Sequence, residues 1–131
     1  GTALEDAVDG IRQVLLEQLG CGGVRAVKVP ALAVAEAHRL DTGNPGDRVY
    51  TRDLFTPEQS PRLGAGVMEM TDTTFSWTLN YDEMDYVVEE TVSAGPGELI
   101  YIPRGSEIRF SVTGHARFLY FVYPADWQKQ P

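Results

Sequence analysis

The chain has 131 residues, of which 43% are hydrophobic and 10% aromatic, and its formal net charge is −8. This length suits one domain with a buried core, and the composition excludes a chain that is disordered throughout. The acidic balance and the scattered Lys and Arg residues argue against nucleic acid and against an anionic membrane surface as partners. A small molecule or another protein therefore remains as the expected partner.

The cellular setting is indicated by hydropathy and by cysteine usage. No apolar run approaches the length of a transmembrane helix, and no signal-peptide pattern opens the chain, which begins at Gly1 and reads as a piece of a longer protein. The one cysteine, Cys21, excludes an internal disulfide and fits a reducing cytoplasm. We therefore expect a cytoplasmic protein, and we interpret Cys21 and the glycines around it as a flexible joint.

Residues 3–19 show the periodicity of an amphipathic helix. Apolar residues recur at spacings of three and four, Thr2 and Glu5 form a capping-box pattern, and a glycine ends the segment. Residues 1–23 thus form the first expected unit and residues 24–131 the second. The helix packs on its own barrel or on a dimer mate, or it docks onto a larger assembly; the sequence leaves both interpretations open.

After this helix the hydrophobic period changes to two, which is typical of strands. A short strand is predicted at 24–29, ended by Pro30, and further strands follow that are β-branched or aromatic and bounded by turn residues. These further strands are predicted at 48–56, 64–70, 74–80, 85–89, 98–102, 107–112 and 116–123. Many short strands without an intervening helix predict a sandwich or a barrel.

A motif marked by glycine and proline indicates the type of barrel. Gly97 is followed by five residues, Pro103, one residue and Gly105, and this pattern resembles the second conserved motif of the cupin superfamily. Gly97 leads into a strand, and the segment from Pro103 to Gly105 turns the chain into the next one. The resemblance implies an all-β fold, a single RmlC-like jelly-roll cupin barrel with an N-terminal helix.

The same resemblance bears on metal binding. The segment 86–89 resembles the strand that follows the first cupin motif, which puts the glutamate of that motif at Glu83. The histidine positions of the two motifs fall on Trp77, Leu79 and Ile108. One carboxylate with three apolar side chains does not hold iron, manganese or zinc tightly. We therefore predict that the barrel has no metal site and no tightly bound cofactor.

The two histidines of the chain, His38 and His115, lie outside both motifs. We interpret them as ordinary surface or turn residues. A metal site would need another set of ligands to converge.

A more specific resemblance covers most of residues 24–128. The segments Phe75–Glu89, Ile100–Phe110 and Phe118–Trp127 are similar to the EutQ family of ethanolamine-utilisation proteins. The resemblance implies a homodimeric, metal-free cupin linked to bacterial microcompartments, whose other proteins it would meet through the N-terminal helix. An ATP-dependent acetate kinase activity is attributed to the family, and this implies ATP, Mg²⁺ and a small carboxylate as ligands if the chain has that activity.

The chain departs from the cupin pattern in one place. Only six residues separate Glu90 from Gly97, where cupins usually insert a further strand pair, and Glu90 replaces the glycine expected after Glu89. Either a hairpin near Glu89–Thr91 is missing from this sequence, or a true deletion removes part of the barrel wall and leaves unpaired edges.

Strand alternation predicts which side chains line the barrel interior. It puts Trp77, Leu79 and Tyr81 on one face, which the motif makes the inner one. We expect Glu83 to join them, with a pKa raised by burial beside Trp77, as a general acid or base; the alternative is a hydrogen-bonded structural remnant. The predicted catalytic residues are Tyr81, Glu83 and Asp85. The predicted pocket residues are Trp77, Leu79, Tyr101 and Ile108.

Three classes of function are consistent with this interior. Phosphoryl transfer between ATP and acetate is implied by the resemblance alone, because the sequence has no P-loop, although Asp82, Glu83 and Asp85 could hold Mg²⁺ through waters. A non-catalytic microcompartment assembly or small-molecule-binding protein is the second class. A sugar epimerase or isomerase is the third, and the missing barrel histidine disfavours it.

Overall fold

The computed structural model describes residues 2–4, 24–89 and 95–131. The chain divides into two compact units, Gly1–Leu32 and Ala33–Pro131. In the described parts of the chain, no helix has the length and apolar character that a bilayer crossing needs. The predicted domain boundary after residue 23 stays a prediction.

The first unit contains one described element, the 3-10 helix η1 (Val29–Ala31), with Pro30 in its first turn. The predicted strand at 24–29 is wrong, because residues 24–28 have no strand pairing and the chain then enters this turn. Proline has a fixed φ and lacks an N–H, so it favours the start of a helical turn. The predicted helix at 3–19 lies, beyond Leu4, outside the described residues and stays a prediction, as does the joint around Cys21.

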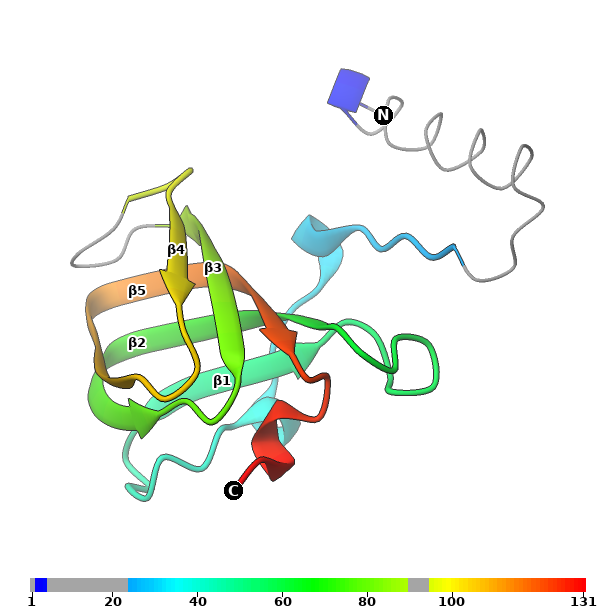
Figure 1. The fold of residues 1–131 in the computed structure, drawn as a ribbon. Coiled ribbons are helices and arrows are strands. Elements are labelled where there is room, and N and C mark those ends of the chain that lie inside the picture. The colour runs from blue at the N-terminus through cyan, green and yellow to red at the C-terminus, as the bar shows by residue number, and fades with distance from the viewer. Residues whose placement is uncertain (1, 5–23, 90–94) are drawn as a thin grey trace. The chain divides into compact units, whose positions relative to one another are not determined.

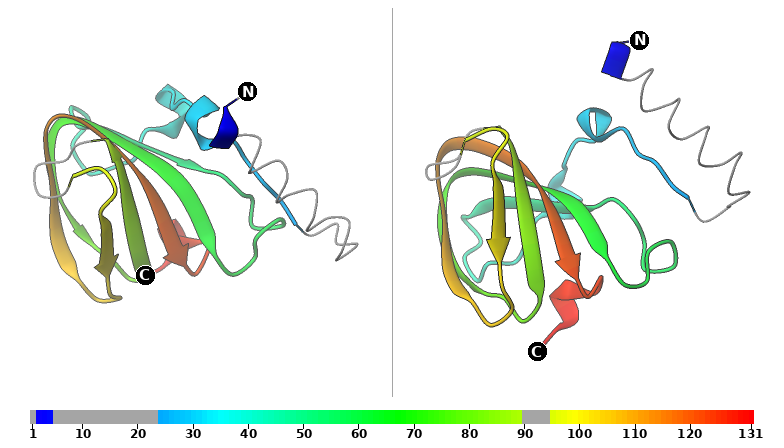
Figure 2. Two further views of the ribbon diagram at one scale, coloured as in Figure 1. Left: turned by 90° about the horizontal axis from the view of Figure 1, so that it is seen from above. Right: turned by 45° about the horizontal axis from the view of Figure 1, so that its top comes forward.

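The second unit is an antiparallel sheet with the strand order β1-β2-β5-β3-β4. Its strands are β1 (Arg48–Asp53), β2 (Gly64–Thr78), β3 (Asp82–Glu89), β4 (Leu99–Ile102) and β5 (Glu107–Tyr123). The long strands β2 and β5 curve strongly, and β3 and β4 run across them in the view of Figure 1. The second pair of views shows the same sheet folding onto itself (Figure 2). The all-β prediction is confirmed.

Two pairs of predicted strands are continuous in the structure. The predicted strands before and after Asp72 form β2, and those before and after Gly114 form β5, because the two strands stay paired through a bulge. Asp72 and Gly114 have φ values of 42° and 80°, and the Gly114 N–H donates to Asp72 Oδ1 at 2.7 Å. In the sequence, Asp72 and Gly114 indicate the ends of strands. In the structure, they bend the paired strands β2 and β5 without ending them.

The β3–β4 connection passes through residues 90–94, which are not among the described ones. Beside it, the Val87 N–H donates to the Glu98 carbonyl at 3.0 Å and the Gly97 N–H to the Val87 carbonyl at 2.9 Å. Within the described ranges, β4 pairs with β3 alone. The predicted choice between a missing hairpin and a deletion near Glu89–Thr91 falls outside the described residues and stays open.

The core lies between the two halves of the folded sheet. Its buried residues come from the segment between η2 (Glu36–His38) and β1, from β1, β2, β4 and β5, from the link between β2 and β3, and from the C-terminal 3-10 helix η3 (Trp127–Lys129). They are Leu40, Val49, Met68, Met70, Phe75, Leu79, Tyr81, Ile102, Val112, Ala116, Phe118, Tyr120, Val122 and Trp127. This core surrounds the face on which the sequence predicts the site.

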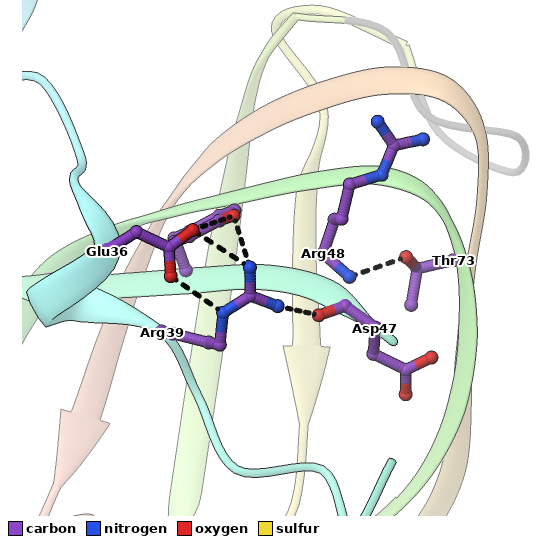
Figure 3. Close-up of polar contacts among 6 residues, drawn as sticks. Glu36, Arg39, Asp47, Arg48 and Thr73 are labelled. Atoms are coloured by element: carbon purple, nitrogen blue, oxygen red, sulfur yellow. Dashed lines mark hydrogen bonds and ion pairs between the residues drawn. The ribbon is translucent and has the colours of Figure 1, made fainter. Parts of the chain in front are cut away.

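A polar clamp fastens the segment before β1. The Arg39 guanidinium donates to both carboxylate oxygens of Glu36, in η2 (Glu36–His38), at 3.0 and 2.9 Å. It also donates to the Tyr50 hydroxyl at 3.0 Å and to the Asp47 carbonyl at 2.6 Å (Figure 3). A two-pronged contact of this kind fixes geometry as well as charge, so the loop after η2 is held against β1.

The histidines lie in a turn and on the surface, which confirms their interpretation. Nδ1 of His38 accepts a hydrogen bond from the Ala35 N–H at 2.9 Å. His115 is exposed on β5, and its Nε2 lies 3.2 Å from Glu69 Oε1 and 3.5 Å from Glu89 Oε2. Neither imidazole belongs to the barrel interior.

Candidate functional site inside the barrel

Two acidic side chains and a tyrosine point into the barrel from β3 and the residue just before it. Tyr81 is 3%, Glu83 7% and Asp85 3% exposed. Their alternate positions put all three on the inner face, as the sequence predicts. Their predicted role in catalysis stays a prediction.

Glu83 and Asp85 form a pair of interacting carboxyl groups. Burial, the charge of Asp85 and a hydrogen bond with it raise the pKa of Glu83 to about 10. Burial also raises the pKa of Asp85 to about 7, against the opposing effect of the hydrogen bond with Glu83. At neutral pH Glu83 therefore keeps its proton and donates it to Asp85, because burial and mutual repulsion disfavour two charges at one site.

One oxygen of this pair lacks a partner. Among the described residues, Oδ1 of Asp85 is a buried side-chain atom without a hydrogen bond. A buried acceptor left unpaired costs about 1–3 kcal/mol of stability. A bound group with a hydrogen-bonding atom would remove that cost.

Aromatic side chains close the barrel beside Tyr81. Trp77 Nε1 donates to the Tyr81 hydroxyl at 2.7 Å. The ring of Trp127 lies 5.5 Å from that of Tyr81, 5.6 Å from that of Tyr120 and 6.4 Å from that of Trp77. Burial, aided by the charge of Glu83, raises the pKa of Tyr81 above its ordinary value, so this phenol is neutral and serves as a hydrogen-bonding group.

Tyr120, Asp53 and Trp127 are parts of this wall that the sequence reasoning misses. The Tyr120 hydroxyl donates to Asp53 Oδ1 at 2.5 Å, and Trp127 Nε1 lies 3.4 Å from the same oxygen. Alternation along 116–123 could have identified Tyr120 as inward-facing. Trp127 follows the last strand in a turn with no periodic pattern, so no sequence signal shows where its ring packs.

The positions that carry histidines in metal cupins are apolar and lie near one another. Trp77 and Ile108 face each other across the β2–β5 ladder. Leu79 is fully buried, donates its N–H to the Ser106 carbonyl at 2.9 Å and accepts from the Gly105 N–H at 2.7 Å. Within ranges 2–4, 24–89 and 95–131, no group of three or more His, Cys, Asp or Glu side chains is arranged to hold a metal ion.

The three acids considered as Mg²⁺ ligands do not converge. Asp82 alternates to the side of β3 away from Glu83 and Asp85, and its Oδ1 accepts from the Arg104 N–H at 2.9 Å. The proton that Glu83 keeps removes a further ligand. The pair then offers at most one ionised carboxylate and is a poor fit for Mg²⁺, which proteins usually hold through one or two carboxylates together with waters and substrate phosphates.

Tyr101 does not belong to the interior pocket, which corrects the prediction. It is 60% exposed and lies opposite Met84 on the outer face of the sheet. Because β4 pairs with β3 in this register, Ile100 and Ile102 take the inner positions and Tyr101 the outer one. The error arises from a strand whose two faces are both apolar, so that its inner face cannot be read from hydropathy.

Two cavities touch the predicted site. The inner cavity has a volume of about 80 Å³ and is lined by Met70, Asp85, Val87, Ile100, Arg109, Phe110, Ser111, Val112 and Phe118. The space under the aromatic wall, bordered by Tyr81, Glu83 and Trp127, measures only about 10 Å³. The interior as it stands therefore admits a small group beside Asp85 and nothing beside Tyr81.

The outer face of the same strands is apolar and exposed. Its side chains are Met84, Tyr86, Val88, Leu99, Tyr101, Phe121 and Tyr123, all exposed by 39% or more. A groove of about 410 Å³ runs along part of it, between Leu63 and the side chains of Met84, Tyr101 and Phe121. A patch of this kind on the surface of a protein marks an interaction site.

Comparison with known proteins identifies the family. The family described as "Ethanolamine utilisation protein EutQ" matches residues 5–129. A relative named "Acetate kinase EutQ" from Clostridioides difficile is 51% identical over 138 aligned positions, which cover 97% of this chain and 88% of the relative. The alignment is longer than the 131 residues of the chain, so this relative has residues without a counterpart here.

More distant relatives and solved structures agree. The "Acetate kinase EutQ" of Salmonella typhimurium is 36% identical over 83% of this chain, and the chain spans 50% of its length. The solved EutQ protein of Clostridium difficile has 56% identity and a TM-score of 0.79 over 83% of this chain and 86% of that one. The cupin domain of Schizosaccharomyces pombe Cnp3, with 13% identity and a TM-score of 0.56 over 79% and 71%, shares the fold alone. The chain therefore belongs to the EutQ family of ethanolamine-utilisation proteins and has the cupin fold.

Proposed function

We propose that this chain transfers a phosphoryl group between ATP and acetate, and that the carboxyl pair of Glu83 and Asp85 is its reaction centre. The activity is the one by which its curated relatives are named, among them one that is 51% identical. The observation that carries the site assignment is the unpartnered oxygen of Asp85 beside a small cavity.

The chemistry of acetate suits a pair that holds a proton. Acetate is ionised at neutral pH, so its oxygen attacks the terminal phosphorus without a base, and ADP leaves with the electron pair of the broken P–O bond. A neutral carboxylic acid in a dry site donates a hydrogen bond to an anionic oxygen. The proton on Glu83 lowers the negative charge of the Glu83–Asp85 pair, so that the pair does not repel acetate. Asp85 supplies the oxygen that shares a proton with the acetate.

The nucleotide must lie outside the inner cavity. A volume of about 80 Å³ is well below the roughly 300–1,000 Å³ of pockets for larger ligands. The terminal phosphate therefore approaches from the rim, where Arg109 borders the cavity. Since the pair is a poor fit for a metal ion, any Mg²⁺ would be held by the phosphates of the nucleotide, and no step here depends on it.

The test is formation of acetyl phosphate from ATP and acetate by the full chain. Asp85→Asn and Glu83→Gln should each lower the rate by about 100-fold or more. Glu107→Gln, the same kind of change at an exposed position of β5, is the matched control and should keep full activity. A wild-type protein without turnover, or two site variants as active as the control, would overturn the proposal.

A non-catalytic assembly role is the second candidate, and the apolar outer face favours it. We propose that this face pairs with a second copy of the chain, since a stable interface has an apolar core that includes aromatic residues. Sedimentation of the full chain should show a dimer that Tyr101→Lys and Phe121→Lys weaken. Binding of other microcompartment proteins through the predicted helix at 3–19 is a further part of this candidate. Its test is co-purification that is lost when Leu4 and Ile11 are both changed to Lys.

A further inference from the structure

We infer that the inner cavity beside Asp85 is the subsite for the carboxylate, that it accepts acids of two or three carbons, and that the acid is bound with a proton shared between its oxygen and Asp85. The inference rests on the proposed function and specifies the substrate class of its reaction centre.

Three polar residues line the cavity, Asp85, Arg109 and Ser111, and its other walls are apolar. Alternation along β5 turns Phe110 and Val112 inward and Arg109 and Ser111 outward, and Ser111 Oγ is engaged with Thr74 Oγ1 at 2.8 Å. Among the described side chains, the polar group that this cavity offers from within is therefore the carboxyl of Asp85. A ligand that fits has one hydrogen-bonding end and one short alkyl end.

The hydrogen-bonding groups available in the cavity favour a carboxylic acid over an amine as ligand. A protonated amine has three N–H donors and would meet one free acceptor, Asp85 Oδ1, so the others would be buried without partners. A carboxyl group shares one proton with that oxygen and keeps its second oxygen for the phosphorus. The alkyl group then contacts side chains such as those of Val87, Ile100 and Val112.

The size of the cavity limits the chain length. A volume of about 80 Å³ equals two or three waters at about 30 Å³ each. Acetate and propionate fill such a space, whereas butyrate must displace a wall. Ile100 is the wall residue easiest to change, because it is partly buried on an edge strand that pairs with β3 alone within the described residues.

The proton makes binding depend on pH. Several ionisable groups surround Asp85. Glu83 on β3 is hydrogen-bonded to it, Tyr81 just before β3 interacts with both carboxyl groups, and Tyr120 on β5 interacts with Glu83 and Tyr81. Arg109 borders the cavity, and the residues that β2 and β4 contribute to it, Met70 and Ile100, are uncharged. Glu83 and both phenols stay neutral, so Asp85 gains or loses the proton. Since its pKa is raised to about 7, an acid that binds above that pH must bring a proton with it.

The test is calorimetric titration of the full chain, without nucleotide, in two buffers of different ionisation heat at pH 6 and 8.5. The probes are acetate, propionate, butyrate and ethylammonium. Acetate and propionate should bind at pH 6, butyrate should bind at least about tenfold more weakly, and affinity should fall about tenfold per unit above pH 7 with uptake of one proton.

Two variants make the result specific. Ile100→Ala should bring butyrate to the affinity of acetate, and Asp85→Asn should remove the proton uptake while Glu107→Gln changes nothing. Preferential binding of ethylammonium, no binding by the wild type at pH 6, or equal affinity for all three acids would overturn the subsite.

The binding and turnover experiments can contradict the subsite and the proposed reaction independently. Proton-linked acetate binding without acetyl phosphate formation would retain the subsite and refute the proposed reaction. If turnover occurs and its preference for acid chain length is the same in Ile100→Ala as in the wild type, the subsite is refuted and the reaction is retained.

Discussion

In the middle of β3, the two faces of the strand have the opposite of the usual polarity. A half-exposed antiparallel strand normally turns apolar residues inward and polar ones outward. Here the inner face holds Glu83 and Asp85, whereas the outer face holds Met84 and Tyr86, which are 45% and 42% exposed. Buried carboxyl groups inside and exposed apolar side chains outside both fail to stabilise the barrel on its own. The proposed reaction centre uses the inner face, and the proposed contact with a second copy of the chain uses the outer one.

The largest loss of stability should come from a change in the aromatic wall beside Tyr81. Trp127→Ala removes a buried ring packed on Tyr81 and Tyr120, and large-to-small changes of this kind cost about 3–5 kcal/mol. Urea unfolding should show this loss, with a smaller one for Trp127→Phe. A loss below about 1 kcal/mol would mean that the ring does not stabilise the inner side.

The next effect concerns the close approach of β2 to Tyr120. A Cβ at Gly66 would lie 2.0 Å from the Tyr120 Cζ, and the hydroxyl of that ring is held by Asp53. Overpacking costs about 1–3 kcal/mol, so Gly66→Ala should lower the unfolding free energy by this amount. Gly95→Ala, at a position with open space, should be neutral. Equal effects of the two substitutions would contradict the packing.

A substitution of Glu83 should raise stability at high pH, in contrast to the two substitutions above, which lower it. Between its ordinary pKa of 4.5 and the raised value of about 10, the folded state keeps a proton that the unfolded state releases, so stability falls as pH rises through this window. Glu83→Gln removes that loss and should raise the melting temperature at pH 8 by about 4 °C for each ~1 kcal/mol. Melting curves from pH 5 to 9, with Glu107→Gln as control, check this. A variant with the wild-type pH slope would contradict the buried proton.

The smallest effect on folding should come from the outer face. Tyr101→Ser removes an exposed side chain, so the unfolding free energy of the monomer should change by no more than about 0.5 kcal/mol. Self-association measured by sedimentation should nevertheless weaken. A large loss of monomer stability would show that Tyr101 packs within the barrel after all.

Much of this arrangement is predictable from local patterns, and the rest is not. Period-two alternation places Trp77, Leu79, Tyr81 and Glu83 correctly because these residues lie on a strand or run directly into one. It fails at Tyr101, because in β4 both alternate sets are apolar and only the pairing with β3 selects the inner one. It also fails where Asp72 bends the β2–β5 ribbon without ending it, because long-range pairing overrides the local turn signal.

The shared proton of the carboxyl pair is measured directly by a carboxyl-carbon NMR titration of the full chain from pH 4 to 10. The variants Glu83→Gln and Asp85→Asn assign the two signals. We predict that the Glu83 carboxyl stays protonated through pH 8 and that Asp85 titrates near pH 7. Ionisation of both groups below pH 5, at the values of exposed carboxyls, would contradict the shared proton on which the proposed site depends.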